Sequence, residues 1–168
     1  MMMTAPTKPM EILAATLRDL GPLRQLEHTC FAGDAWPLLD LVAVLTWPDV
    51  VRYKAVMDGK MIGFIAGDTR RMEGIAWIAT IAVLPEHRRR GIGRTLLQVC
   101  EQRLPTARIR LCVRAENSGA IRLYESEDYR QVDIWRKYYH DSGDALVMEK
   151  IRERPMEKTG ELQPGVKE

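Results

Sequence analysis

The chain has little of what several broad classes of protein require. It contains only three cysteines, Cys30, Cys100 and Cys112, with no C-x-x-C spacing and no recognisable signal peptide. We therefore expect reduced thiols in a cytoplasmic protein and no metal site. No apolar run approaches the length of a bilayer span, so we expect no membrane association. The net charge of +2 is too small to indicate a nucleic-acid partner.

The length and composition indicate one globular domain. A chain of 168 residues can bury a full core, and 46% hydrophobic residues is ordinary for such a domain. Residues 1–9 carry little pattern, whereas residues 152–168 are charged and punctuated by proline and glycine. We predict a flexible N-terminus at 1–9, a folded domain at 10–151 and a mobile charged tail at 152–168.

A strand, a tight glycine loop and a helix follow one another between residues 81 and 97. The apolar run that opens this stretch stops at Pro85, and Gly91 and Gly93 come before an apolar-periodic segment. The first turn of a helix offers unpaired backbone N–H groups and partial positive charge, and both favour an anion. The loop is therefore predicted to bind phosphate, and four arginines surround it: Arg88, Arg89, Arg90 and Arg94.

Two well-known phosphate loops do not fit this stretch. A dinucleotide loop needs G-x-G-x-x-G, but the residue three after Gly93 is Leu96. A nucleoside-triphosphate loop needs a lysine after its second glycine, and no lysine follows either glycine here. What remains is R-x-x-G-x-G, from Arg88 to Gly93, which resembles the acetyl-CoA pyrophosphate loop of the GCN5-related N-acetyltransferase (GNAT) superfamily. An ordinary helix entry with a solvated basic face is the alternative.

The expected order of elements agrees with this resemblance. We predict strands at 12–17, 50–57, 61–66, 74–84, 107–114, 133–138 and 144–151. Helices are expected from Asp19 to before Gly33, and at 38–45, 91–103 and 117–127. Asp58-Gly59-Lys60 is predicted to close a hairpin, and residues 68–71 to form a polar turn. The expected fold class is α/β, a mixed twisted sheet of about seven strands flanked on both faces by about four helices, as in GNAT proteins.

A second segment, from residue 111 to residue 129, carries the other half of the resemblance. Asn117, Ala120, Leu123 and Tyr124 match the superfamily's N-x-x-A-x-x-L-Y pattern. Taken alone, Asn117 is a natural helix N-cap and Tyr124 a half-buried helix tyrosine, but the arginine loop upstream favours the family. Within the superfamily, V-R-A-E-N-S-G-A-I-R-L-Y-E-S and Y-Y-H-D-S-G-D-A-L-V-M are similar to N-terminal protein acetyltransferases, in particular the bacterial ribosomal-protein-alanine acetyltransferases.

The resemblance implies an acetyl-CoA-dependent transfer to an amine. It implies that backbone N–H groups near Val83 polarise the thioester carbonyl and that residues 89–95 hold the pyrophosphate. It also makes Tyr124 the general acid that gives a proton to the departing CoA sulfur. The residues assigned in this way to acetyl-CoA are Ile81, Ala82, Val83, Arg88, Arg89, Arg90, Gly91, Ile92, Gly93, Arg94, Thr95, Asn117 and Tyr124.

Two positions depart from the family pattern. Cys112 stands where the ribosomal-protein enzymes have the general-base glutamate, and a neutral thiol is a poor base at pH 7. We hypothesise that no side chain at this position takes the proton. An α-amino group, with a reference pKa of about 7.7–8.0, tolerates this better than a lysine, and a water held by the backbone or Thr80 is a possible exit. Asp128 replaces a helix-ending glycine, but aspartate adopts the left-handed conformation readily.

The acceptor amine is the open part of this interpretation. Tyr138 and Tyr139 adjoin the last hairpin, which borders the peptide N-terminus in the protein acetyltransferases, so both are candidate substrate residues. Simple strand packing is the alternative for these tyrosines. Trp36, Trp77 and Trp135 are expected in the core or as groove walls. The leading hypothesis is a protein N-terminus as acceptor. The alternatives are a small amine held in a closed acidic pocket and a non-catalytic acyl-CoA-binding module.

Overall fold

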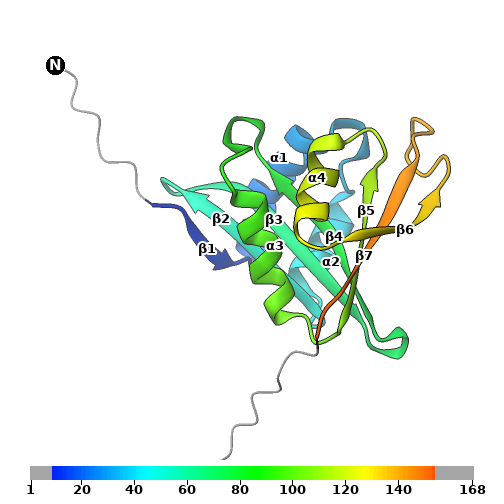
Figure 1. Cartoon of the computed structure of the whole chain (residues 1–168). Helices are drawn as coiled ribbons and strands as arrows, with labels where there is room; N and C mark the ends of the chain where they lie inside the picture. Colours follow the sequence, from blue (N-terminus) through cyan, green and yellow to red (C-terminus); the bar gives the residue numbers. More distant parts are fainter. Residues whose placement is uncertain (1–8, 154–168) are drawn as a thin grey trace, which may run out of the picture.

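A mixed seven-stranded sheet is the centre of the molecule (Figure 1). The computed structural model describes residues 9–153, so most of the predicted N-terminal and C-terminal extensions, 1–9 and 152–168, lies outside the described residues. The strand order is β1-β2-β3-β4-β5-β7-β6, and β4 and β5 are the parallel pair in an otherwise antiparallel sheet. The strands are β1 (Glu11–Ala14), β2 (Val50–Met57), β3 (Lys60–Arg70), β4 (Ile75–Val83), β5 (Arg108–Arg114), β6 (Arg130–Trp135) and β7 (Ala145–Ile151).

Within the described residues, four α-helices cover the two faces of the sheet, two on each face (Figure 1). They are α1 (Leu20–Phe31), α2 (Leu38–Thr46), α3 (Ile92–Arg103) and α4 (Ser118–Ser126). Apolar side chains of α3 and α4 pack with one face of the central strands, and those of α1 and α2 pack with the other face. The predicted α/β architecture is therefore confirmed.

Local sequence signals account for two of the main joints of this fold. The β2–β3 hairpin turns at Asp58 and Gly59, whose φ angles are +50° and +76°, as a tight hairpin turn requires. Helix α3 lies directly on β3 because Gly67 has no side chain. A Cβ there would meet the Cys100 Sγ at 3.0 Å and the Leu104 Cδ2 at 3.1 Å. The glycine thus allows the close approach that fixes α3 over the sheet.

Three predicted boundaries were wrong, each because of a contact that periodicity does not reveal. The strand expected at 12–17 ends at Ala14, since the Thr16 N–H donates to the Asp19 carboxylate at 2.8 Å and starts a 3₁₀ turn at 17–19. Residues 68–70 of the polar turn expected at 68–71 are instead strand, because β3 continues to pair with β4 as far as Arg70, and Arg71 starts a 3₁₀ turn. The strand expected at 133–138 is β6, which starts at 130 and ends at 135. Beyond it the Asp144 carboxylate accepts the Lys137 N–H at 2.9 Å.

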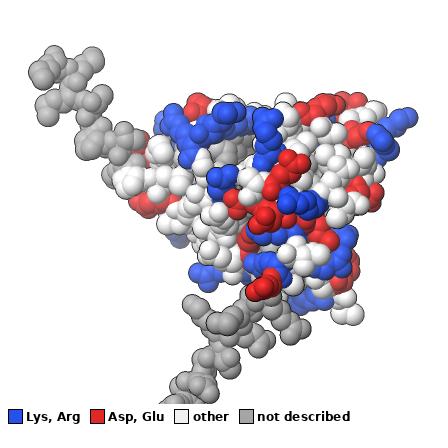
Figure 2. Space-filling view, viewed as in Figure 1, with Lys and Arg blue, Asp and Glu red and all other residues white. Residues whose placement is uncertain are grey.

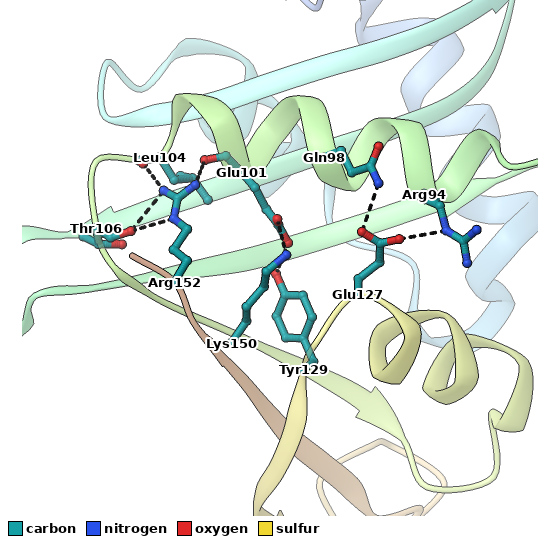
Figure 3. A network of polar contacts seen from close by, with 9 residues as sticks. All are labelled: Arg94, Gln98, Glu101, Leu104, Thr106, Glu127, Tyr129, Lys150 and Arg152. Carbon is teal, nitrogen blue, oxygen red and sulfur yellow. Dashed lines mark hydrogen bonds and ion pairs between the residues drawn. The ribbon is translucent and has the colours of Figure 1, made fainter. Parts of the chain in front are cut away.

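A buried polar network ties the C-terminal half of α3 to the last strands (Figure 3). The Tyr129 hydroxyl donates to the Glu101 carboxylate at 2.7 Å, and the Lys150 ammonium donates to its other oxygen at 2.8 Å. The Arg152 guanidinium donates to the backbone carbonyls of Leu104 and Thr106 and of Glu101, next to the end of α3. The Lys150 cation and the Tyr129 hydroxyl compensate the buried Glu101 charge, and Arg152 binds carbonyls near the C-terminal end of α3 and just beyond it.

The described residues also bear on the expectations about membranes, metals and thiols. Within residues 9–153 no helix has the length and apolarity needed to cross a bilayer. The same residues hold no cluster of three or more side chains that could bind a metal ion. Cys30, Cys100 and Cys112 are all free thiols.

Candidate active site

The central strands β4 and β5 separate in the middle of the sheet. They pair only from Ile75 with Arg108 to Ile78 with Leu111, and beyond that point β4 pairs only with β3 while β5 pairs only with β7. A bulge at Ala79 marks the start of the separation, and Ala79 is exposed although β4 is a central strand. The result is a wedge between two parallel strands, called the cleft below.

Backbone N–H groups of β4 point into this cleft. The Leu84 N–H donates to the Ile62 carbonyl on the β3 side at 2.9 Å. Because successive N–H groups of a strand point to opposite edges, the N–H of Val83 and that of Ile81 point toward the β5 side. Two donors are therefore aimed at the space between the separated strands, the geometry expected where a carbonyl oxygen gains negative charge.

The loop from β4 to α3 has the backbone shape of an anion site. Gly91 is the N-cap of α3 with a φ of +78°, and Arg89 is also left-handed, with a φ of +61°. Left-handed residues in such a loop turn neighbouring N–H groups toward one another, next to the unpaired N–H groups of the first turn of α3. Ile92 is buried beneath the turn, and the Thr95 hydroxyl donates to the Gly91 carbonyl at 2.9 Å.

Of the four arginines in and next to this loop, two are engaged in contacts within the protein and two are not. The Arg88 Nε donates to the Val83 carbonyl at 2.9 Å, which braces the loop against the end of β4. Arg94 binds the C-terminal end of α4 through Glu127 at 2.8 Å (Figure 3). It also donates to the Ser126 hydroxyl at 2.9 Å. Arg89 and Arg90 are exposed and have no ion pair within residues 9–153. Figure 2 shows Lys and Arg side chains gathered at this edge of the molecule, so the two uncommitted arginines give it a positive surface for a phosphate.

Packing holds the side chain of Tyr124, which lies near the C-terminal end of α4. It is 5% exposed, and its ring meets the Tyr129 ring edge-on at 5.9 Å between centroids. Burial raises the pKa of the Tyr124 phenol, and the nearby Tyr139 raises it further. The predicted general acid therefore lies near a predicted substrate residue, and its hydroxyl stays protonated at neutral pH. Asn117 caps α4 by accepting the Ala120 N–H at 3.1 Å, as its sequence position predicted.

The face of the sheet that α1 and α2 partly cover carries Cys112 together with the candidate substrate residues Tyr138 and Tyr139. Burial raises the pKa of the Cys112 thiol to about 11. Cys112 lies close enough to raise, after burial, the pKa values of Tyr138 and of Tyr139. The pKa of Tyr139 reaches about 12. All three groups are therefore neutral at pH 7, and Cys112 has no thiolate to offer as a base.

Arg114 joins the two loops that flank this face, and the sequence did not single it out. Its guanidinium binds Asp34, in the α1–α2 connection, and Asp141, in the β6–β7 loop, at 3.0 Å to the Oδ2 of Asp141. The same guanidinium stacks over the Tyr139 ring at 4.0 Å from its centroid. Aromatic rings continue along the sheet from there, with Tyr138 on Trp135 and Trp135 on Trp77 at 5.4 and 5.8 Å.

Glu27, a buried residue of α1, is a second group that the sequence analysis did not single out. Glu27 is fully buried, and its carboxylate accepts the Thr80 hydroxyl at 3.2 Å and the Trp36 N–H at 3.4 Å. The sequence did indicate that Glu27 is unusual, because this charged residue follows Leu23 by four positions and so falls on the buried face of its helix. The left-handed Asp128, with a φ of +69°, was in contrast predicted from sequence.

Comparison with known proteins agrees with this geometry. The model of the acetyltransferase (GNAT) family matches residues 20–128. The N-alpha-acetyltransferase RimI of Mycobacterium tuberculosis is 35% identical over 151 residues, which cover 87% of this chain and 95% of that protein. The [ribosomal protein bS18]-alanine N-acetyltransferase of Escherichia coli is 35% identical over 104 residues, 58% of this chain and 69% of that protein.

Solved structures show the same architecture. The crystal structure of the ribosomal-protein-S18-alanine N-acetyltransferase from Escherichia coli superposes with a TM-score of 0.76 at 28% identity and covers 89% of this chain and 98% of that one. The Arabidopsis thaliana NAA60 complex with acetyl-CoA has the same fold, with a TM-score of 0.74 at 21% identity over 85% of this chain and 98% of that one. The family match spans more than half of the chain, so this protein belongs to the GNAT family and is an acetyl-CoA-dependent N-acetyltransferase.

Proposed function

We propose that the enzyme transfers the acetyl group of acetyl-CoA to the α-amino group of a protein N-terminus. The observation that carries the proposal is the similarity to the mycobacterial RimI, a protein named N-alpha-acetyltransferase that aligns over 95% of its length. The Escherichia coli relative is named for the alanine of a ribosomal protein, which makes an N-terminal alanine the first acceptor to test. A ribosomal acceptor and three free thiols both suit the cytoplasm as the compartment.

The charges beside the cleft favour a peptide over a small polycationic amine. Asp34 and Asp141, one in each flanking loop, are both paired with Arg114. A polyamine or aminoglycoside site needs carboxylates that are free to bind ammonium groups. The aromatic rings of Tyr138, Trp135 and Trp77 instead give an extended surface suited to the apolar and backbone groups of a peptide.

The chemistry we propose follows the positions of the groups around the cleft. The pyrophosphate of acetyl-CoA binds at the turn before α3, and Arg89 and Arg90 supply the free positive charge. The pantetheine arm then runs between β4 and β5, where the N–H groups of Ile81 and Val83 stabilise the negative charge that develops on the thioester oxygen. The amine attacks the carbonyl carbon, the C–S bond breaks, and Tyr124 gives its proton to the sulfur.

An α-amino acceptor suits the absence of a basic side chain at Cys112. The buried thiol, with a pKa of about 11, remains protonated at pH 7. A lysine acceptor, with a reference pKa of about 10.4, would be almost wholly protonated at that pH. An α-amino group, with a reference pKa of about 7.7–8.0, has an appreciable neutral fraction. The first deprotonation can then occur in solution, before the amine binds.

The proposal is tested by incubating the purified protein with acetyl-CoA and a panel of acceptors while measuring free CoA. The panel contains peptides with free alanine N-termini, the same peptides with blocked N-termini and an internal lysine, and small polyamines. We expect CoA release only with the free α-amino peptides. A Cys112→Ala variant is expected to keep most of the wild-type kcat. CoA release with polyamines alone, or a collapse of kcat in Cys112→Ala at unchanged KM, would contradict the proposal.

A further inference from the structure

Glu27 is a buried carboxylate without a positive partner. Its side chain is completely buried, and within residues 9–153 no lysine or arginine forms an ion pair with it. Burying an ionised carboxylate is costly unless a cation or several donors compensate, and here only the Thr80 hydroxyl and the Trp36 N–H donate to it. Glu101, the comparable buried glutamate of α3, does have a cation, Lys150. Packing alone therefore does not explain why a carboxylate occupies this position.

Thr80 connects this carboxylate to the cleft. It follows the bulge at Ala79, where β4 and β5 separate, and it comes just before Ile81, whose N–H points into the cleft. Thr80 is 9% exposed as a residue, and it lies where β4 no longer pairs with β5. A hydroxyl has one proton and two acceptor lone pairs. Because the proton is directed to Glu27, the lone pairs are left for a donor that enters from the cleft.

We propose that Thr80 and Glu27 form the route by which the attacking amine loses its proton, so that Glu27 acts on the amine through the Thr80 hydroxyl. The proposal deepens the proposed function and rests on it. When the amine nitrogen forms its bond to the thioester carbon, an N–H proton passes to the Thr80 oxygen. The hydroxyl proton of Thr80 passes at the same time to the Glu27 carboxylate. The C–S electron pair leaves with sulfur, which takes its proton from Tyr124. Glu27 then releases its proton through Thr80 to solvent in the cleft, and the Tyr124 phenolate takes up a proton from solvent, so both groups return to their starting forms.

The surroundings of Glu27 suit a proton acceptor. Burial raises the pKa of its carboxyl group, and the hydrogen bonds from Trp36 and Thr80 offset only part of that rise. A higher pKa makes the carboxylate a stronger base, provided that it is still ionised at the working pH. The groups that face it are the Trp36 N–H from the α1–α2 connection, the Thr80 hydroxyl from β4, and the Cys30 thiol, which is close enough for Glu27 to raise its pKa. Arg88 reaches Cys30 rather than Glu27 itself.

The experiment compares four single variants and the Glu27→Gln/Thr80→Val double variant by kcat and its pH dependence, with an alanine-terminated peptide as acceptor. Glu27→Gln keeps the shape of the side chain but removes the carboxylate that takes up the proton, and Thr80→Val removes the hydroxyl. Thr80→Ser restores the hydroxyl, and Glu101→Gln removes a buried carboxylate from the far side of the sheet. Thermal denaturation and calorimetric titration with CoA check that each variant is folded and binds the co-substrate.

We expect kcat to fall about 100-fold in both Glu27→Gln and Thr80→Val, at the lower end of the range for general-base groups, with little change in CoA affinity. In the wild type, kcat declines as the pH falls through the raised pKa of Glu27, and this acid limb is expected to vanish in Glu27→Gln. The double variant should be no slower than either single one, because the two groups act as a unit. Thr80→Ser should retain most of the activity, and Glu101→Gln should retain the acid limb even if it is less stable.

Two results would overturn the inference. One is a Glu27→Gln enzyme whose kcat stays within a few-fold of the wild type. The other is a slower Glu27→Gln enzyme that keeps the wild-type acid limb, because that outcome would make Glu27 only a structural tether. A failure of the proposed function is a different result, since the wild-type protein itself would then release no CoA with α-amino peptides.

Discussion

Gly91, the N-cap of α3, and Gly93, in the first turn of that helix, should respond to alanine in opposite ways. Gly91 has a φ of +78°, and a Cβ there would meet no atom within 4 Å, so the cost of Gly91→Ala is backbone strain alone. Gly93 is inside α3 with an ordinary helical backbone, and a Cβ there would lie 3.4 Å from the Leu123 Cδ2 and 3.8 Å from the Val83 Cγ2, both normal contacts. One substitution therefore strains the loop, while the other fills space and favours the helix.

The magnitudes follow from general values. A left-handed backbone costs an L-residue about 1–2 kcal/mol. Alanine at a helical glycine position gains about 0.5–1 kcal/mol. For a domain of this size a change of 1 kcal/mol moves the Tm by about 2–4 °C. We therefore expect Gly91→Ala to lower the Tm by about 2–8 °C and Gly93→Ala to leave it unchanged or raise it slightly.

Thermal denaturation with and without CoA distinguishes backbone strain at the substituted residue from a loss of CoA binding. If Gly91→Ala relieves its strain by moving the loop, the stabilisation by CoA should also shrink, because a ligand stabilises the folded state by RT ln(1 + [L]/Kd) and this falls as Kd rises. Gly93→Ala should keep the CoA-induced shift. A Gly91→Ala protein as stable as the wild type, or a Gly93→Ala protein that is much less stable, would refute the assignment of the strained position.

Three further predictions concern Tyr124 and the buried glutamates Glu101 and Glu149. Tyr124→Phe should lower kcat about 100-fold while calorimetry shows unchanged CoA affinity, because only the proton donor is lost; wild-type activity would contradict the role. Lys150→Met should cost about 3–5 kcal/mol in urea denaturation by leaving the buried Glu101 without its cation; a loss below about 1 kcal/mol would contradict this. Burial alone would raise the pKa of Glu149, but hydrogen bonds from two arginines hold it below its usual value. The ionised Glu149 carboxylate therefore stabilises the folded protein at pH values above the unfolded pKa of about 4.3. This stabilisation should be lost as the pH falls through the lower pKa of the folded state. Glu149→Gln should abolish this part of the acid sensitivity in pH-dependent melting.

Much of the fold was predictable because local signals and periodicity agree. The turn at Asp58 and Gly59, the cap at Asn117 and the left-handed Asp128 were each expected from a residue's own conformational preference. The boundaries that failed depend on other parts of the chain. The strand β3 extends to Arg70 only because β4 pairs with it there, and nothing in the sequence of residues 68–71 predicts that pairing.

The candidate site was predictable to a different extent. The motif located the loop, but the division of its arginines depends on residues that are distant in sequence. Arg94 is committed to Glu127 and Ser126, about thirty residues away, and Arg88 to a carbonyl of β4. A motif states which residue types recur at a site, whereas only the packed structure states which of them still have a free charge. The pyrophosphate role that we propose therefore rests more on Arg89 and on Arg90 than on the arginine that opens the R-x-x-G-x-G pattern.

The same distinction applies to the proton acceptor. Attention falls on Cys112 because it replaces a glutamate within a recognised pattern, yet its buried thiol is neutral at pH 7. Glu27 belongs to no such pattern, but a charged residue four positions after Leu23, on an otherwise apolar helix face, conflicts with the binary pattern of an amphipathic helix. Sequences violate their local rules most often at functional sites, because there the chemistry requires what packing disfavours. A charged residue on a buried helix face is therefore a signal in its own right. Here it points to the carboxylate that lies one hydroxyl away from the cleft.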